Sequence, residues 1–202
     1  MATEEDGAKF LDRDFNQCFN QMRHHDSQIL EIVKFALTAY AALVGAALAF
    51  YKYGLDKGAD YRSPGVAISI VGLMLGIALL ALVIRNRAYF VLVARYINEH
   101  RAFFLKDRPL GFANVTRMYT NPSQPQYFNW RSSQALLCYS LAILNSGLLG
   151  LVVYFIFDKS QHRWWMVGIG GVLLLGAQLG PAIAYLKSRE GKSASEAVFG
   201  RE

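Results

Sequence analysis

Four long apolar runs constrain this chain more than any other feature. They occupy residues 29–50, 66–84, 135–157 and 164–186 of the 202-residue sequence. At ~1.5 Å per residue, runs of this length are sufficient to cross a hydrocarbon core of ~30 Å. The bilayer interior offers no water to backbone amides, so such spans are helical. The pattern therefore predicts an all-α membrane protein with four transmembrane helices arranged in two hairpins.

The apolar runs divide the sequence into five segments. Residues 1–28 are predicted to form a cytoplasmic amphipathic helix, 29–84 the first transmembrane hairpin and 132–186 the second, with polar turns at 51–64 and 158–163. Residues 85–131 are predicted to form a cytoplasmic helix followed by an aromatic, basic loop, and 187–202 a disordered cytoplasmic tail. Neither proline nor glycine separates the polar helices from the first two spans. Two long rods forming a cytoplasmic stalk are therefore expected.

Lysine and arginine are distributed unevenly along the chain. Sixteen of the 21 lie in the first 34 residues, in 85–131 or in the tail, and only five lie in the two turns. The positive-inside rule then places both termini and the central segment in the cytoplasm, in a bacterial inner membrane. Topology accounts for the net charge of +6, so direct DNA binding is not expected. The acidic start of the chain lacks a signal-peptide pattern.

An apolar stripe marks the N-terminal helix. Its residues recur at spacings of three and four, which is typical of a helical seam: Leu11, Phe15, Cys18, Met22 and His25. A second stripe runs through 89–104. Two interpretations stay open for the first stripe: it packs on the second stripe of its own chain, or it forms a coiled coil between subunits.

Motifs for catalysis or metal binding are missing from the sequence. There is no glycine-rich phosphate loop, no Cys/His ligand spacing and no pair of carboxylates within a span. The trio His24-His25-Asp26 is the densest polar cluster, but neighbouring helical side chains point about 100° apart. Cys18 and Cys138 provide no disulfide framework. We therefore expect neither an enzyme nor a cofactor or metal site.

Two groups of residues are candidates for function. The loop contains arginines that could clamp an anion and aromatic rings that could stack on a ligand: Arg108, Arg117, Tyr119, Tyr127, Trp130 and Arg131. The alternative is that these residues contact lipid headgroups and the membrane interface. Within the spans, Asn145 and Gln178 are predicted either to bond between helices or to line a hydrated pore.

At the level of architecture, the chain resembles small membrane subunits of bacterial anti-phage defence systems of the Hailong and Kiwa type. The resemblance is carried by residues 15–50, a polar helix running into an alanine-rich span, and by Arg85-Asn-Arg-Ala-Tyr with Arg95-Tyr-Ile-Asn and Arg101 after the second span. It implies a homo-oligomer, often a tetramer, whose opening or clustering damages the host membrane. A soluble sensor protein or a nucleotide would be the signal. The alternative function is a non-conducting anchor that recruits a soluble partner.

Overall fold

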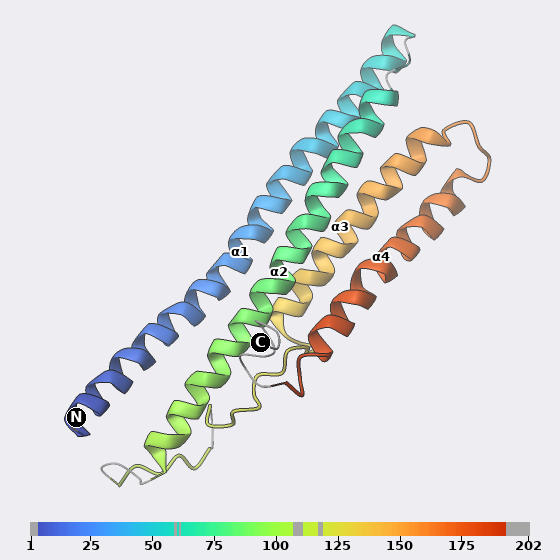
Figure 1. Ribbon diagram of the computed structural model, residues 1–202. Helices are drawn as coiled ribbons and strands as arrows, with labels where there is room; N and C mark the ends of the chain where they lie inside the picture. Colours follow the sequence, from blue (N-terminus) through green and yellow to red (C-terminus); the bar gives the residue numbers. More distant parts are fainter. Residues whose placement is uncertain (1–3, 59, 61, 107–110, 117–118, 193–202) are drawn as a thin grey trace. The chain divides into compact units, whose positions relative to one another are not determined.

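The computed structural model describes residues 4–58, 60, 62–106, 111–116 and 119–192. Four α-helices make up the regular structure of this part of the chain (Figure 1). They are α1 (Glu4–Lys57), α2 (Arg62–Leu105), α3 (Ser133–Ile156) and α4 (Arg163–Lys187). Each is long and apolar enough to cross a membrane. For the described residues, the predicted all-helical class and the four membrane-span-like helices are confirmed.

The first two helices are much longer than a bilayer is thick. The 54 residues of α1 correspond to a contour of about 80 Å and the 44 residues of α2 to about 65 Å, at ~1.5 Å per residue. As expected, no break separates the polar part of either helix from its apolar run. Only part of each helix can therefore lie within a hydrocarbon core of ~30 Å.

The prediction of a polar turn at 51–64 is wrong. α1 continues to Lys57 and α2 begins at Arg62, so only residues 58–61 lie between the two helices. Gly58 follows α1 with a φ of +65°, the left-handed conformation that commonly ends a helix. Pro64 is compatible with helix because it lies in the first turn of α2, where its missing N–H has no helical partner to lose.

Contacts divide the chain into two units that we describe separately. The polar unit comprises residues 1–29, 85–129 and 186–202, and the apolar unit comprises 30–84 and 130–185. α1 and α2 each contribute a segment to both units. α3 and nearly all of α4 belong to the apolar unit.

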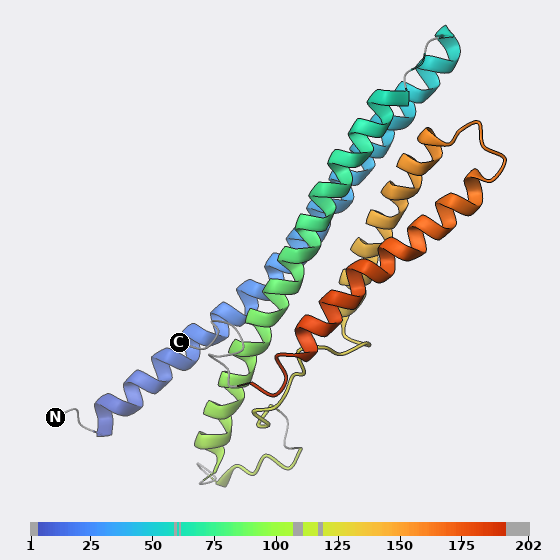
Figure 2. The same ribbon diagram turned by 45° about the vertical axis from the view of Figure 1, so that its right-hand side comes forward.

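Within the apolar unit, the helices approach one another at glycines. A Cβ at Gly72 of α2 would lie 3.0 Å from Leu43 of α1 and 3.3 Å from Leu148 of α3. A Cβ at Gly150 of α3 would lie 3.2 Å from Val167 of α4. In both ribbon views α3 and α4 lie side by side (Figures 1 and 2). Small residues at these points allow the close backbone approach that membrane helices use to pack.

One carboxylate connects the ends of these helices. Asp158, in the turn between α3 and α4, forms ion pairs of 3.2 Å with Arg62 at the start of α2 and of 3.2 Å with Arg163 at the start of α4. The Tyr51 hydroxyl of α1 donates to the same carboxylate at 3.5 Å. Asp158 thus holds three helices at one end of the apolar unit.

Candidate functional site

A chain of uncharged polar side chains runs through the middle of the apolar unit. The Tyr40 hydroxyl of α1 donates to Asn145 Oδ1 of α3. The Asn145 amide donates in turn to Gln178 Oε1 of α4 at 2.6 Å. Gln178 Nε2 donates to the carbonyls of Ala142 at 3.4 Å and Leu174 at 3.3 Å. Three helices are therefore joined by hydrogen bonds at membrane depth.

The remaining helix, α2, has a glycine where these polar side chains need space. A Cβ at Gly76 of α2 would overlap both Tyr40 Oη and Asn145 Oδ1. Gly76 lies four residues after Gly72, a glycine spacing that allows membrane helices to pack closely, and at Gly76 it also admits the two polar groups. Only glycine fits here, because the two oxygens occupy the space that a methyl group would need.

The side chains at the centre of this hydrogen-bonded row are buried. Asn145 is fully buried and Tyr40 is 4% exposed. An amide or hydroxyl without a partner in hydrocarbon costs several kcal/mol, and these groups satisfy one another. The arrangement carries no charge, so it can fix the four helices in register but cannot bind an ion by charge.

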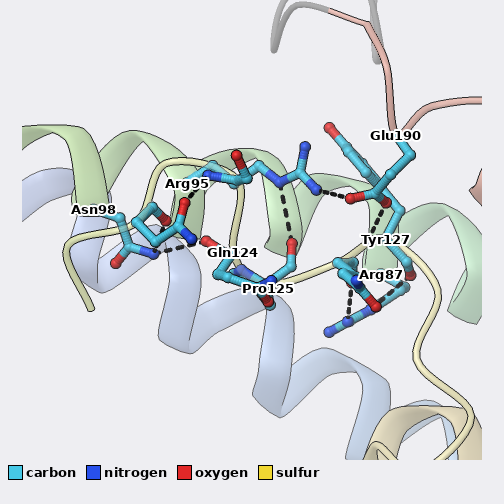
Figure 3. Close-up of polar contacts among 10 residues, drawn as sticks. Arg87, Arg95, Asn98, Gln124, Pro125, Tyr127 and Glu190 are labelled. Atoms are coloured by element: carbon cyan, nitrogen blue, oxygen red, sulfur yellow. Dashed lines mark hydrogen bonds and ion pairs between the residues drawn. The ribbon is translucent and has the colours of Figure 1, made fainter. Parts of the chain in front are cut away.

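The polar unit contains a second network, which holds the loop after α2. Arg87 of α2 donates to the Tyr127 carbonyl at 3.2 Å and to the Gln126 carbonyl at 2.6 Å. Arg95 donates to the Pro125 carbonyl at 3.1 Å. Asn98 donates to the carbonyls of Asn121 at 3.1 Å and Gln124 at 2.7 Å. We call Arg87, Arg95 and Asn98 the loop clamp (Figure 3).

The segment after α4 completes the loop clamp. Glu190 pairs with Arg95, and its second oxygen accepts from the Tyr127 amide at 2.9 Å (Figure 3). The Arg95 guanidinium also lies 4.6 Å from the Tyr127 ring centroid. The expectation of a disordered tail from Lys187 is therefore wrong for residues 188–192, because Glu190 gains a buried cation as its partner. Residues 193–202 lie outside the described part.

An open pocket of about 490 Å³ lies elsewhere in the polar unit. Its walls are mainly aromatic, with rings from α1, α2 and the loop: Phe15, Phe104, Phe112 and Tyr119. Its polar groups belong to Asp12, Arg101 and Asn114. The Arg101 guanidinium lies 5.7 Å from the Phe15 ring and 5.2 Å from the Tyr119 ring. We call this the Arg101 pocket.

The stripe on α1 faces α2 within the polar unit. Its members Leu11, Phe15, Cys18, Met22 and His25 are all half-buried. The Phe15 ring lies 6.2 Å from the His100 ring, and the His25 ring lies 5.6 Å from the Tyr89 ring, each pair nearly parallel. Such ring contacts add to the area that packing buries.

Asp14 is the polar partner of α2 beside this stripe. Its carboxylate accepts from the Tyr96 hydroxyl at 2.9 Å and lies 3.5 Å from His100 Nε2. The hydrogen bond to Asp14 raises the pKa of Tyr96, because the charged acceptor favours the protonated phenol. Burial, reinforced by Asp14, raises the pKa of the Cys18 thiol. Cys18 is therefore kept as a thiol rather than a reactive thiolate.

The predicted ligand residues of the loop are found in different surroundings. Arg108 and Arg117 lie outside the described residues. Tyr119 lines the Arg101 pocket, whereas Tyr127 is 1% exposed beneath Arg95. Trp130 and Arg131 are exposed and belong to the apolar unit, where the Trp130 ring lies 6.3 Å from the Tyr139 ring. Among the four described members of this set, Tyr119 is the one that lines the pocket.

Several residues of these networks were not predicted as site residues. Arg87, Arg95 and Asn98 recur at spacings of eight and three, which places them on one face of α2, and this regularity was a usable signal. Gly76 lies four residues after Gly72, a spacing that signals close helix packing but not a polar site, and Tyr40 carries no local signal. Glu190 lies in a segment without periodicity, so its partner depends on tertiary structure.

Comparison with protein-family models, with curated proteins and with solved structures gives no match to this chain. Among the described residues, no group of three His, Cys, Asp or Glu side chains could hold a metal ion.

Proposed function

We propose that this protein is an oligomeric bacterial inner-membrane protein that acts as a gated pore or membrane-perturbing effector. In this proposal α1 to α4 cross the bilayer as two hairpins. Both termini and residues 85–131 lie in the cytoplasm, where the polar unit forms a stalk. A cytoplasmic signal, from a soluble sensor protein or a nucleotide, controls opening. The architectural resemblance to anti-phage membrane subunits is the support for a role in defence.

The observation that carries the proposal is the surface of α4. No residue of the 18-residue apolar stretch of α4 is buried within the chain, whereas 22–33% of the residues in the corresponding stretches of α1, α2 and α3 are buried. Gly176, Gly180 and Ala184 are all exposed and recur every four residues, and a Cβ at either glycine would meet open space. We call these residues the α4 ridge. A small-residue ridge of this spacing is the surface on which a second membrane helix packs closely.

A complementary ridge lies on α1. Ala41, Gly45 and Ala49 have the same spacing and are all exposed, and a Cβ at Gly45 would also meet open space. Pairing the α1 ridge of one copy with the α4 ridge of the next joins two different surfaces. Repetition of such a head-to-tail contact forms a ring when the rotation from one copy to the next closes, and our proposal requires this closure. A pore between copies is favoured over a pore within one copy, because the Tyr40–Asn145–Gln178 chain fills the centre of the single bundle.

Two continuous helices provide the route for control. α1 and α2 each run without a break from the polar unit into the apolar unit. A ligand that changes how the two helices pack in the polar unit therefore acts on the same helices in the membrane. The loop clamp and the α1 stripe are the contacts that such a change would rearrange.

Recordings from planar lipid bilayers test this proposal. We expect purified full-length protein to give discrete conductance steps whose frequency changes with a cytoplasmic ligand. The Gly180→Leu variant, which fills the α4 ridge, should lose the steps, and Gly147→Leu, at an exposed glycine of α3 where a Cβ also meets open space, should keep them. Wild-type protein that gives no conductance under any ligand would contradict the pore.

A specific surface favours the second candidate function, a membrane anchor for a soluble partner. Four large apolar side chains at the end of α2 and in the loop are strongly exposed: Phe103, Phe104, Phe112 and Val115. Exposed aromatic clusters are typical of protein contacts. A pull-down from host lysate with the full chain, compared with Phe103→Ser, tests it. Retention of one stoichiometric partner, lost with Phe103→Ser and without any conductance, would favour the anchor.

A further inference from the structure

The Arg101 pocket has the dimensions of a small-molecule site. Its volume of about 490 Å³ falls within the ~300–1,000 Å³ typical of such sites. Three segments distant in the sequence contribute to it, namely the start of α1, the end of α2 and the loop residues Phe112, Asn114 and Tyr119. A ligand bound here would contact all three segments at once and would stabilise one arrangement of the two long helices.

The charges of the pocket define the class of ligand. Arg101 is half-buried between two aromatic rings and forms no ion pair with any described residue. A desolvated guanidinium binds most strongly to a carboxylate or phosphate, which accepts two parallel hydrogen bonds. Asp12 lies in the same pocket. Among the described lining residues, Arg101 is the cation that attracts an anion and Asp12 is a carboxylate that repels one. A ligand with several negative charges is therefore disfavoured relative to one with a single carboxylate on Arg101.

The walls define the rest of the ligand. Phe15, Phe104 and Phe112 offer apolar ring surface, and a ligand that covers it gains about 25 cal/mol per Å² of buried apolar area. We propose that the Arg101 pocket binds an apolar monocarboxylate, with the carboxylate on Arg101 and its hydrocarbon or ring body against these phenylalanines.

This inference deepens the proposed control by a cytoplasmic ligand, and its biological meaning rests on that proposal. Binding and conductance are nevertheless measured independently. Naphthoate binding without conductance would support the proposed binding site and contradict the proposed pore. Conductance without naphthoate binding would contradict the proposed binding site and leave the proposed pore supported.

Calorimetric titration of the full-length protein in phosphatidylcholine nanodiscs tests the site, with empty nanodiscs subtracted. The probe is 2-naphthoate, and the neutral comparison is 2-naphthalenemethanol. We expect Arg101→Gln to weaken naphthoate binding about tenfold or more, because it removes a charge-assisted contact, and to leave binding of the alcohol unchanged. Asp12→Asn should strengthen naphthoate binding, because it removes a nearby negative charge.

Matched variants separate loss of the site from loss of the fold. Arg85 lies 5.6 Å from the Tyr89 ring and outside the Arg101 pocket, so Arg85→Gln should bind naphthoate like the wild type. Phe112→Ala should weaken the acid and the alcohol equally. Equal naphthoate affinity in wild type and Arg101→Gln would overturn the proposal, as would Arg101-dependent binding of ATP tighter than that of naphthoate. Displacement of naphthoate in phosphatidylglycerol nanodiscs would overturn it in favour of a lipid headgroup.

Discussion

Gly76 has only a hydrogen atom as its side chain, and the close packing at this position depends on that. Any Cβ at this position overlaps the oxygens of Tyr40 and Asn145, so Gly76→Ala must displace one of them from the polar chain. We expect a loss of about 1–3 kcal/mol of unfolding free energy, the usual cost of overpacking. Unfolding in detergent followed by circular dichroism measures it. Gly147→Ala, where a Cβ meets open space, should change stability by less than ~0.5 kcal/mol, and equal effects of the two variants would contradict the account.

His25 should make the stability of the polar unit depend on pH. Burial lowers its pKa, the neighbouring His24 lowers it further, and a hydrogen bond with Gln28 opposes both effects. The ring stacks on Tyr89. Because the folded pKa is below that of the unfolded chain, the folded state binds the proton less readily. Its contribution to stability is complete above the ordinary pKa of about 6.5 and is lost as the pH falls below that value and through the lowered pKa of the folded state.

We therefore expect the melting temperature to fall as the pH is lowered from about 6.5 through the lowered pKa of His25. His25→Asn should remove part of that fall. His162→Asn, at an exposed position in the turn before α4, should leave the fall as it is in the wild type. The same pH dependence in wild type and His25→Asn would show that the packing against Tyr89 does not titrate.

At the scale of elements, the loop clamp joins α2, the loop and the segment after α4. Glu190 is the contact shared by all three, since it binds Arg95 and the Tyr127 amide. Arg95 is buried, whereas the Glu190 side chain is 41% exposed. We therefore discount the cost of breaking the pair to about 1–2 kcal/mol.

Hydrogen exchange measures this contact directly. In Glu190→Ala, amides of residues 119–129 should exchange about tenfold faster, because local opening becomes easier by roughly 1.4 kcal/mol. Glu99→Ala, at an exposed acid of α2, should leave these residues as protected as in the wild type. Unchanged exchange in Glu190→Ala would mean that the arginines and Asn98 hold the loop without the tail.

The elements could be predicted from sequence because apolar periodicity acts locally. The runs at 135–157 and 164–186 correspond closely to α3 at Ser133–Ile156 and α4 at Arg163–Lys187. The polar turn at 51–64 was mispredicted because charged residues on exposed helical positions resemble a turn in composition. The polar networks were harder to predict from the sequence. Arg87 and Arg95 were counted only as topological charges, and Glu190, the partner of Arg95, lies 95 residues further along the chain.

At the scale of the whole molecule, the distribution of basic residues predicts the topology. A reporter that is active only in the cytoplasm should be active when fused after Lys192 and inactive when inserted after Lys159, because the turns carry five of the 21 basic residues. Activity after Lys159 would reverse the proposed orientation and place the Arg101 pocket outside the cell.

The central claim is that copies of this chain assemble through the α4 ridge. Native mass spectrometry of the protein released from nanodiscs tests it most directly. We expect wild-type protein and Gly147→Leu at one defined multiple of the 22.6 kDa chain, and Gly180→Leu at a single chain mass. Wild-type protein found only as a single chain would contradict the claim.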